Sequence, residues 1–143
     1  MPILRLATLV LASFLVATSA RAAEEPGSRV HAKTGKYEDV RDDLKDAIIN
    51  RGFVIDHVGD LSAMLERTAE AVENAKSPYL KAEFLQFCPL RLTHEAASAS
   101  PLAIANCPVA IFVYEAASAP GEILVGYRLP PATTSSALRQ INE

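Results

Sequence analysis

The last part of the chain reads as two strands joined by a short connection, and this pattern limits the fold more than any other. The segment 107–115, CPVAIFVYE, is the most continuous apolar strand in the sequence, which is typical of a central strand. The segment 117–121, ASAPG, carries a Pro-Gly turn signal, and apolar residues alternate along 122–129, EILVGYRL. Strands joined so closely pair antiparallel. The sequence therefore predicts an antiparallel hairpin at the end of the fold.

Strand-like and helix-like segments alternate upstream of this hairpin. A short strand is expected from residue 29 to a turn at Gly35, and further strands at 53–58 and 79–87. Helices are expected within 37–53, 59–78 and 89–100. This order predicts an α+β two-layer sandwich, with the helices on one face of a mostly antiparallel sheet.

The first two helices have recognisable apolar faces and ends. The first has a stripe of Val40, Leu44, Ala47 and Ile48, and Gly52 is placed to adopt a left-handed conformation just past its end. Asp60 is the expected N-cap of the second helix. The expected inward face of that helix is Leu61, Met64, Leu65, Thr68, Ala69 and Val72. Met64 could serve as a copper ligand, but this spacing favours a place in the core.

The N-terminal 22 residues have the layout of a secretory signal peptide. Arg5 precedes an apolar run at 6–16, and the small residues that follow end in a cleavage signal at Ala22. The run is shorter than the roughly 20 residues of a membrane helix. Cleavage is favoured over a retained anchor because the small residues fit the signal peptidase. The expected location is the periplasm or the extracellular medium. We expect a polar leader at 23–28, one domain at 29–131 and a tail at 132–143.

The charge of the mature chain argues against two classes of partner. Removal of Arg5 and Arg21 with the leader changes the formal net charge from −3 to about −5. The sequence has no cluster of lysine and arginine that would bind nucleic acid or an anionic membrane. We therefore expect no nucleic acid partner, and no membrane partner after the leader is removed.

Several segments resemble a known bacterial family. The helix that ends in RGF, the MLERT segment, AEFLQFCP and NCPVAIFVYEAASAPGEILVGYR are similar to the family called domain of unknown function 302, and most closely to its exported branch. The resemblance covers about residues 29–129. It implies a compact α+β fold like one half of the TATA-binding protein, with a sheet that can support a homodimer. It implies no catalytic residue, because the family has no assigned activity.

The only two cysteines, Cys88 and Cys107, are each followed by proline. Cys88 is expected to be the N-cap of the helix within 89–100, where the positive helix end would lower its thiol pKa. Cys107 precedes a strand. An exported protein with two cysteines favours one disulfide, which would contribute about 3 kcal/mol by closing the loop. A metal, haem or redox role and two separate buried thiols are the alternatives.

Patterns for metal sites and known catalytic sites are weak or missing. The sequence has no C-x-x-C, H-x-x-x-H, G-x-S-x-G or phosphate-binding loop. Cys88, His94 and Cys107 are the weak candidate ligands for copper, zinc or non-covalent haem. For each of the histidines His31, His57 and His94, a surface or hydrogen-bonded role is favoured over metal binding. Tyr114, Tyr127 and Arg128 could line a pocket or a dimer surface, although packing is the favoured interpretation.

The favoured functional hypothesis is a non-enzymatic exported domain that binds a ligand or partner near Cys88, His94 and Cys107. Its most concrete form is a redox or metal accessory protein with a periplasmic redox partner. One alternative is a thiol enzyme with Cys88 as nucleophile and Cys107 as the resolving thiol. The other is a structural homodimer formed through the sheet, with one inert disulfide.

Overall fold

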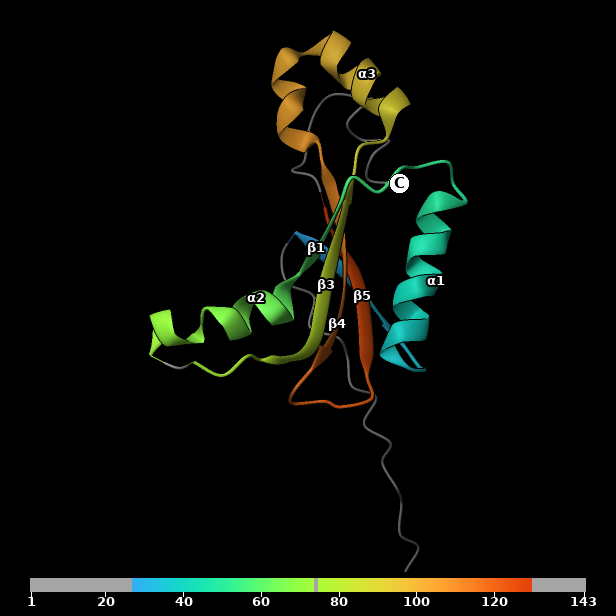
Figure 1. Cartoon of the computed structure of the whole chain (residues 1–143). Coiled ribbons are helices and arrows are strands. Elements are labelled where there is room, and N and C mark those ends of the chain that lie inside the picture. Colours follow the sequence, from blue (N-terminus) through green and yellow to red (C-terminus); the bar gives the residue numbers. More distant parts are fainter. Residues whose placement is uncertain (1–26, 74, 130–143) are drawn as a thin grey trace, which may run out of the picture.

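A computed structural model describes residues 27–73 and 75–129 of the chain (Figure 1). The expected leader at 1–22, its cleavage at Ala22 and the tail at 132–143 lie outside these residues, as do residues 23–26 of the polar leader expected at 23–28. The elements in chain order are β1 (Ser28–Lys33), α1 (Tyr37–Ile49), β2 (His57–Asp60), α2 (Leu61–Arg67), the 3₁₀ helix η1 (Ala69–Val72), β3 (Tyr79–Phe87), α3 (Leu90–Ala99), the 3₁₀ helix η2 (Pro101–Asn106), β4 (Val109–Ala116) and β5 (Ile123–Arg128).

The strands form one five-stranded sheet in the order β1-β5-β4-β3-β2, and every neighbouring pair is antiparallel. The predicted terminal hairpin is confirmed, since β4 pairs with β5 across the connection that contains Gly121. The register places Val113 opposite Val125 on β5 and opposite Glu83 on β3. The α+β class with an antiparallel sheet is therefore as predicted.

Helix α1 covers one face of the sheet, and the core lies between them. One cluster joins Tyr37 to Val113 and Ile123, with Val40, Leu44 and Val125 packed around it. The other joins Ile48 to Leu85 and Phe87, and the side chains packed against it are Leu44, Phe53, Ile55, Val109 and Ile111. The predicted stripe of α1 thus faces the sheet. Gly52 has φ of 81°, which is the left-handed conformation expected just after the helix.

The second predicted helix differs from the structure. It ends at Arg67, continues as the separate turn η1, and stops at Glu73, which has a left-handed φ of 58°. Its expected inward face is confirmed only in part. Leu61, Leu65 and Ala69 are half-buried, whereas Thr68 is exposed and Met64 and Val72 are 38% and 56% exposed. No residue of α2 or η1 is fully buried. The strand expected at 53–58 is also displaced, to His57–Asp60. Phe53 and Ile55 precede it and pack on the core from an irregular segment.

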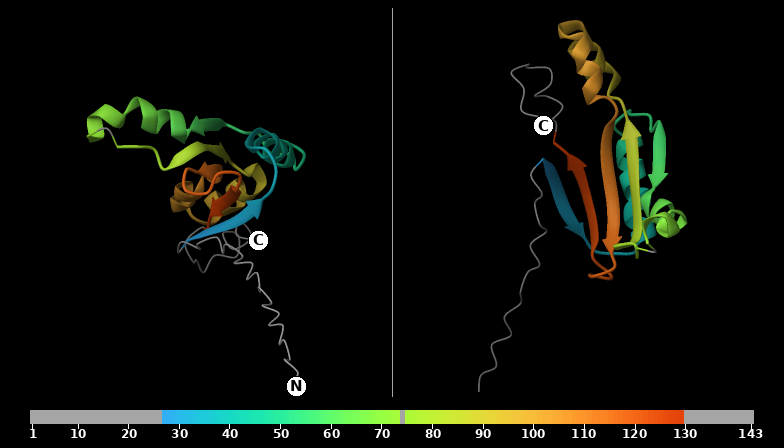
Figure 2. Two further views of the ribbon diagram at one scale, coloured as in Figure 1. Left: turned by 90° about the horizontal axis from the view of Figure 1, so that it is seen from below. Right: turned by 90° about the vertical axis from the view of Figure 1, so that its left-hand side faces the viewer.

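The two ends of the sheet carry different structures. Helix α2 projects from one corner, away from the side on which α1 lies, and α3 with η2 forms a lobe beyond the end of β3 and the start of β4 (Figures 1 and 2). Large aliphatic side chains of this lobe are exposed, namely Leu90, Leu102 and Ile104. Within the described ranges, no helix is long and apolar enough to cross a membrane.

Candidate functional site

Cys88 and Cys107 form a disulfide, with their Cα atoms 5.6 Å apart. Cys88 follows β3 and Cys107 precedes β4, and these strands are paired through Phe87 and Val109. The register therefore brings the two cysteines together at one end of the sheet, and the bond closes the α3–η2 lobe at its base. The predicted disulfide is present in the structure.

The expected position of Cys88 at the helix terminus is wrong by one residue. The N-cap of α3 is Pro89, and Cys88 lies outside the helix. A disulfide sulfur is not a thiolate, which is the form that attacks electrophiles and binds zinc, copper or haem iron. In this state neither cysteine can act as the nucleophile or ligand that the expected helix position of Cys88 suggested.

The candidate ligand His94 lies exposed on α3, and His31 and His57 are exposed on the two edge strands. Within residues 27–73 and 75–129, no group of three or more histidine, cysteine or acidic side chains could hold a metal ion. A hollow of about 470 Å³ does lie beside Cys88, lined by residues 88–92 and by Gly52, Phe53, Val54 and Asp56. Its lining is mostly apolar and includes Asp56 and Arg91 as charged residues.

A larger hollow lies on the sheet face opposite α1, which we call the open face. Figure 2 (right) looks onto this face, with α1 behind the sheet and α2 at the lower corner. Residues directly opposite each other on paired strands share a face, so the register groups the side chains into rows. The central row is Val30, Gly126, Phe112, Phe84 and Gly59. The next row toward α2 is Ala32, Leu124, Tyr114 and Ala82. Both rows are apolar or aromatic.

Two glycines determine how the central aromatic rings lie. Phe84 and Phe112 are directly paired, but each ring extends over a glycine of the strand on its outer side. A Cβ added at Gly59 would lie 2.1 Å from the Phe84 ring, and one at Gly126 would lie 2.5 Å from the Phe112 ring. The rings therefore point away from each other. Aromatic rings often cover glycines in this way in sheets.

The space over the two middle strands forms a hollow of about 660 Å³. Its floor carries the small side chains of Ala82 and Ala110, and Phe84, Phe112, Tyr79 and Tyr114 contribute aromatic surface. Leu61, at the start of α2, closes one corner. A volume of this size with mainly apolar lining is typical of small-molecule sites.

The two ends of the hollow differ in polarity. Ser28, Gln86 and Arg128 lie at the end near the α3–η2 lobe. Tyr79 and Tyr114 lie at the other end, with their ring centroids 5.4 Å apart in an edge-to-face arrangement. Burial raises the pKa of Tyr114, with smaller contributions from Tyr79 and the carboxylate of Glu122. The phenol of Tyr114 therefore stays protonated and uncharged at neutral pH.

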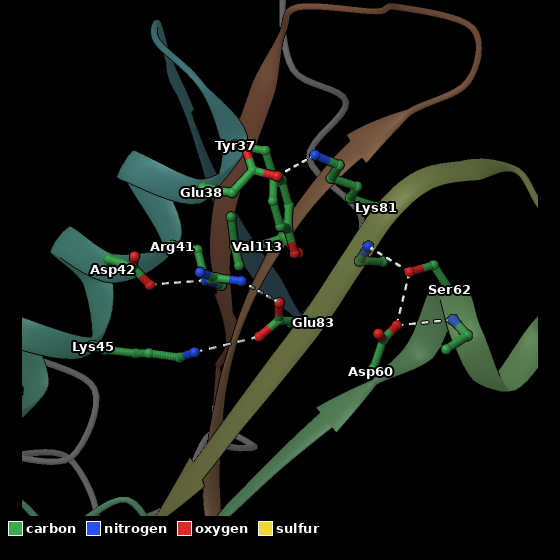
Figure 3. Close-up of polar contacts among 12 residues, drawn as sticks. Tyr37, Glu38, Arg41, Asp42, Lys45, Asp60, Ser62, Lys81, Glu83 and Val113 are labelled. Atoms are coloured by element: carbon green, nitrogen blue, oxygen red, sulfur yellow. Dashed lines mark hydrogen bonds and ion pairs between the residues drawn. The ribbon is translucent and has the colours of Figure 1, made fainter.

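The charged residues near α1 serve the fold. Glu83 contributes to the lining of the hollow, but its carboxylate contacts Arg41 at 3.4 Å and Lys45 at 3.6 Å, both on α1 (Figure 3). Lys81 pairs with Glu38 on the same side of the sheet. These ion pairs hold α1 against β3. Among the residues that the structure describes, Arg128 is the one cationic residue that lines the hollow on the open face.

The profile of the Domain of unknown function DUF302 family matches residues 29–142. The chain belongs to this family. A crystal structure of an uncharacterized conserved DUF302 protein from Bacillus stearothermophilus has a similar fold, with a TM-score of 0.66 and 13% sequence identity. The match covers 82% of this chain and 88% of that chain. No curated protein matches this DUF302 chain significantly.

The sequence predicted only part of the open face of this DUF302 domain. Tyr114 and Arg128 do line a hollow, as one interpretation of the hairpin allowed, whereas Tyr127 lies in the opposite face because it pairs with Ile111. Phe84, Phe112 and the two glycines were not among the expected site residues. The available signal was the segment 79–87, which has apolar residues on both faces of one strand.

Proposed function

We propose that this DUF302 chain is an exported, non-enzymatic binding domain that takes a small apolar ligand on the open face of its sheet. The single observation that carries the proposal is the hollow between Phe84 and Phe112. The export signal at 1–22 supports a periplasmic or extracellular setting. In this setting the Cys88–Cys107 bond acts as a structural brace at the end of the sheet.

The chemistry of the hollow favours binding over catalysis. Its aromatic and alanine surface offers dispersion contacts and burial of apolar area, which give affinity without a reaction. Among the residues that the structure describes, the lining includes no cysteine or histidine, which are frequent nucleophiles and bases in enzymes. A planar ring system would lie between the two phenylalanine rings and above Ala82 and Ala110.

Fluorescence titration with anthracene-2-carboxamide, an uncharged planar probe, tests the proposal. The variant Ala110→Phe fills the floor of the hollow and should abolish binding. The matched control Ala117→Phe adds the same ring at an exposed position after β4 and should leave binding unchanged. Phe112→Leu removes aromatic surface, should disturb the fold less than Ala110→Phe does, and should weaken binding. Equal binding by the wild type and all three variants would overturn the proposal.

A homodimer formed through the same face is the second candidate. It is favoured by the two apolar rows, which extend from Val30 and Ala32 on the edge strand across to β3. Sedimentation equilibrium separates the two candidates. A dimer that dissociates in Ala110→Phe and not in Ala117→Phe would replace the small ligand by a second copy of the chain.

A redox role with a periplasmic partner is the third candidate, and the hollow beside Cys88 favours it. The disulfide would have to be reduced and reformed by thiol exchange with that partner. Zinc, copper or haem binding by Cys88, Cys107 and His94 would also need the reduced state. The alkylation experiment described in the Discussion tests both ideas.

A further inference from the structure

Arg128 is the residue of the open face that the apolar binding proposal leaves without a role. It lies at the end of β5, is exposed, and lines the polar end of the hollow. Across residues 27–73 and 75–129 it enters no ion pair, whereas Arg41, Lys45 and Lys81 are all paired with carboxylates. The guanidinium is therefore available to a group that is not part of the described fold.

The hollow is polarised along the strands. Arg128, at the end of β5, and the amide of Gln86, near the end of β3, lie at one end, next to the α3–η2 lobe. The other end has Tyr79, Tyr114 and Leu61 and no cationic residue in its lining, among the residues that the structure describes. An anion is attracted to the first end by the charge of Arg128. A ligand with an apolar body and one anionic group is thus oriented in a single direction.

We propose that the open face binds amphipathic organic anions, with the apolar body between Phe84 and Phe112 and a carboxylate or similar group at Arg128. This inference rests on the proposed binding function and names its ligand class. A guanidinium presents several N–H donors in one plane, which matches the two oxygens of a carboxylate. Gln86 lies on the same side of the hollow and can donate through its side-chain amide.

The expected contribution of the anionic group is moderate. Arg128 is exposed, so water and salt screen its charge, and exposed ion pairs contribute little. We expect anthracene-2-carboxylate to bind roughly fivefold more tightly than anthracene-2-carboxamide at low salt, and the difference to shrink as salt is added. The two probes share one ring system, so their ratio isolates the effect of the charge.

The matched variants are Arg128→Gln and Arg29→Gln. Arg29 lies on the neighbouring strand β1 and pairs with Tyr127, so its side chain lies on the opposite face of the sheet. Both variants change the net charge by the same amount. Arg128→Gln should remove the preference for the carboxylate over the carboxamide, whereas Arg29→Gln should keep the preference.

The outcomes separate this inference from the proposed function. If the carboxamide binds in a manner that Ala110→Phe abolishes, and both probes bind equally to the wild type, only the anion inference is overturned. A carboxylate preference that persists in Arg128→Gln also overturns it. If neither probe binds to the wild type, both proposals are overturned.

Discussion

The ring of Phe112 lies over Gly126 on the neighbouring strand, where a Cβ would come within 2.5 Å of the ring and 2.6 Å of the carbonyl oxygen of Arg29. Both contacts are closer than real Cβ atoms tolerate. The glycine therefore lets the ring lie against the sheet and turn away from Phe84. The shape of the hollow depends on this pair and on the corresponding pair Phe84–Gly59.

The variant Gly126→Ala should lower the free energy of unfolding by about 1–3 kcal/mol, because a ring and a backbone carbonyl would both have to move. Gly59→Ala is the matched comparison, since its nearest contacts are all atoms of the Phe84 ring. That ring can turn toward the hollow, so the loss in stability should be smaller and anthracene-2-carboxamide should bind less well. Urea unfolding and probe titration measure both effects. Equal losses of stability in the two variants would contradict the role of the backbone contact at Gly126.

Local signals in the sequence were sufficient for the terminal hairpin and for α1. The Pro-Gly turn near residue 120, the stripe from Val40 to Ile48 and Gly52 each depend on neighbours within a few residues. The break after Arg67 was not predicted, because apolar spacing alone suggested a continuous helix through Val72. Whether such a helix continues depends on how it packs against the rest of the domain, and α2 has no buried residue.

The open face could not be found from the sequence either, because it also depends on how the elements pack together. The segment 79–87 has apolar residues on both faces, so its pattern does not say which face α1 covers. The ion pairs of Glu83 with Arg41 and Lys45 lie on the covered face. The hollow itself depends on Phe84, Phe112, Gly59 and Gly126, which come from four strands. Their alignment follows from strand register, which is a property of the folded chain.

Loss of the Cys88–Cys107 bond should destabilise the domain by about 3 kcal/mol, because a closed loop between cysteines 19 residues apart restricts the unfolded chain. The double variant Cys88→Ser/Cys107→Ser and the reduced wild type should show the same loss in urea unfolding. The double variant should not respond to reductant, which makes it the control.

Alkylation followed by mass spectrometry distinguishes a structural bond from a redox-active one. The folded, untreated protein should incorporate no label at Cys88 or Cys107, and denatured protein treated with reductant should incorporate label at both. Opening of the bond by glutathione in the folded protein would contradict a purely structural role and favour the redox candidate. Zinc or copper binding that appears only after such opening would favour the metal candidate.

Tyr37 should make stability fall at alkaline pH. Its hydroxyl donates to the carbonyl oxygen of Val113 at 3.4 Å, and the side chain is 4% exposed. Burial, followed by the charge of Glu83, raises the pKa of Tyr37 well above its usual value. The phenol of Tyr37 therefore stays protonated to higher pH in the folded protein than in the unfolded chain, where tyrosines titrate at about pH 10. The resulting stability is fully present below that pH and is lost as the pH rises above it.

The variant Tyr37→Phe tests this link between burial and pH. At neutral pH its free energy of unfolding should be about 1 kcal/mol lower than that of the wild type, because the hydrogen bond to Val113 is lost. Above about pH 10 its stability should decline less steeply than that of the wild type, because no buried phenol is forced to ionise. Urea unfolding at a series of pH values gives both numbers. An identical decline in the two proteins would show that another group controls the alkaline limit.

Asp60 should control the stability of α2 at acidic pH. Its carboxylate accepts hydrogen bonds from the backbone N–H of Ala63 and the hydroxyl of Ser62, both at 2.8 Å, as predicted for an N-cap. The Ala63 N–H, followed by the Ser62 hydroxyl, lowers the pKa of Asp60. The stability from this cap is therefore present above the unfolded value of about pH 4 and is lost as the pH falls through the lower folded value.

Because α2 has no buried residue, loss of the cap should open this helix before the rest of the domain. Asp60→Ala should cost about 1 kcal/mol in local stability and speed amide exchange in α2 at neutral pH. Asp60→Asn keeps an acceptor oxygen, so it should preserve most of the protection of α2 against amide exchange. Because the amide side chain does not titrate, this protection should not be lost at acidic pH. Leu61 follows the cap and closes a corner of the hollow, so Asp60→Ala should also weaken binding of anthracene-2-carboxamide. Unchanged exchange in α2 together with unchanged probe binding would show that the packing of Leu61 holds this corner without the cap.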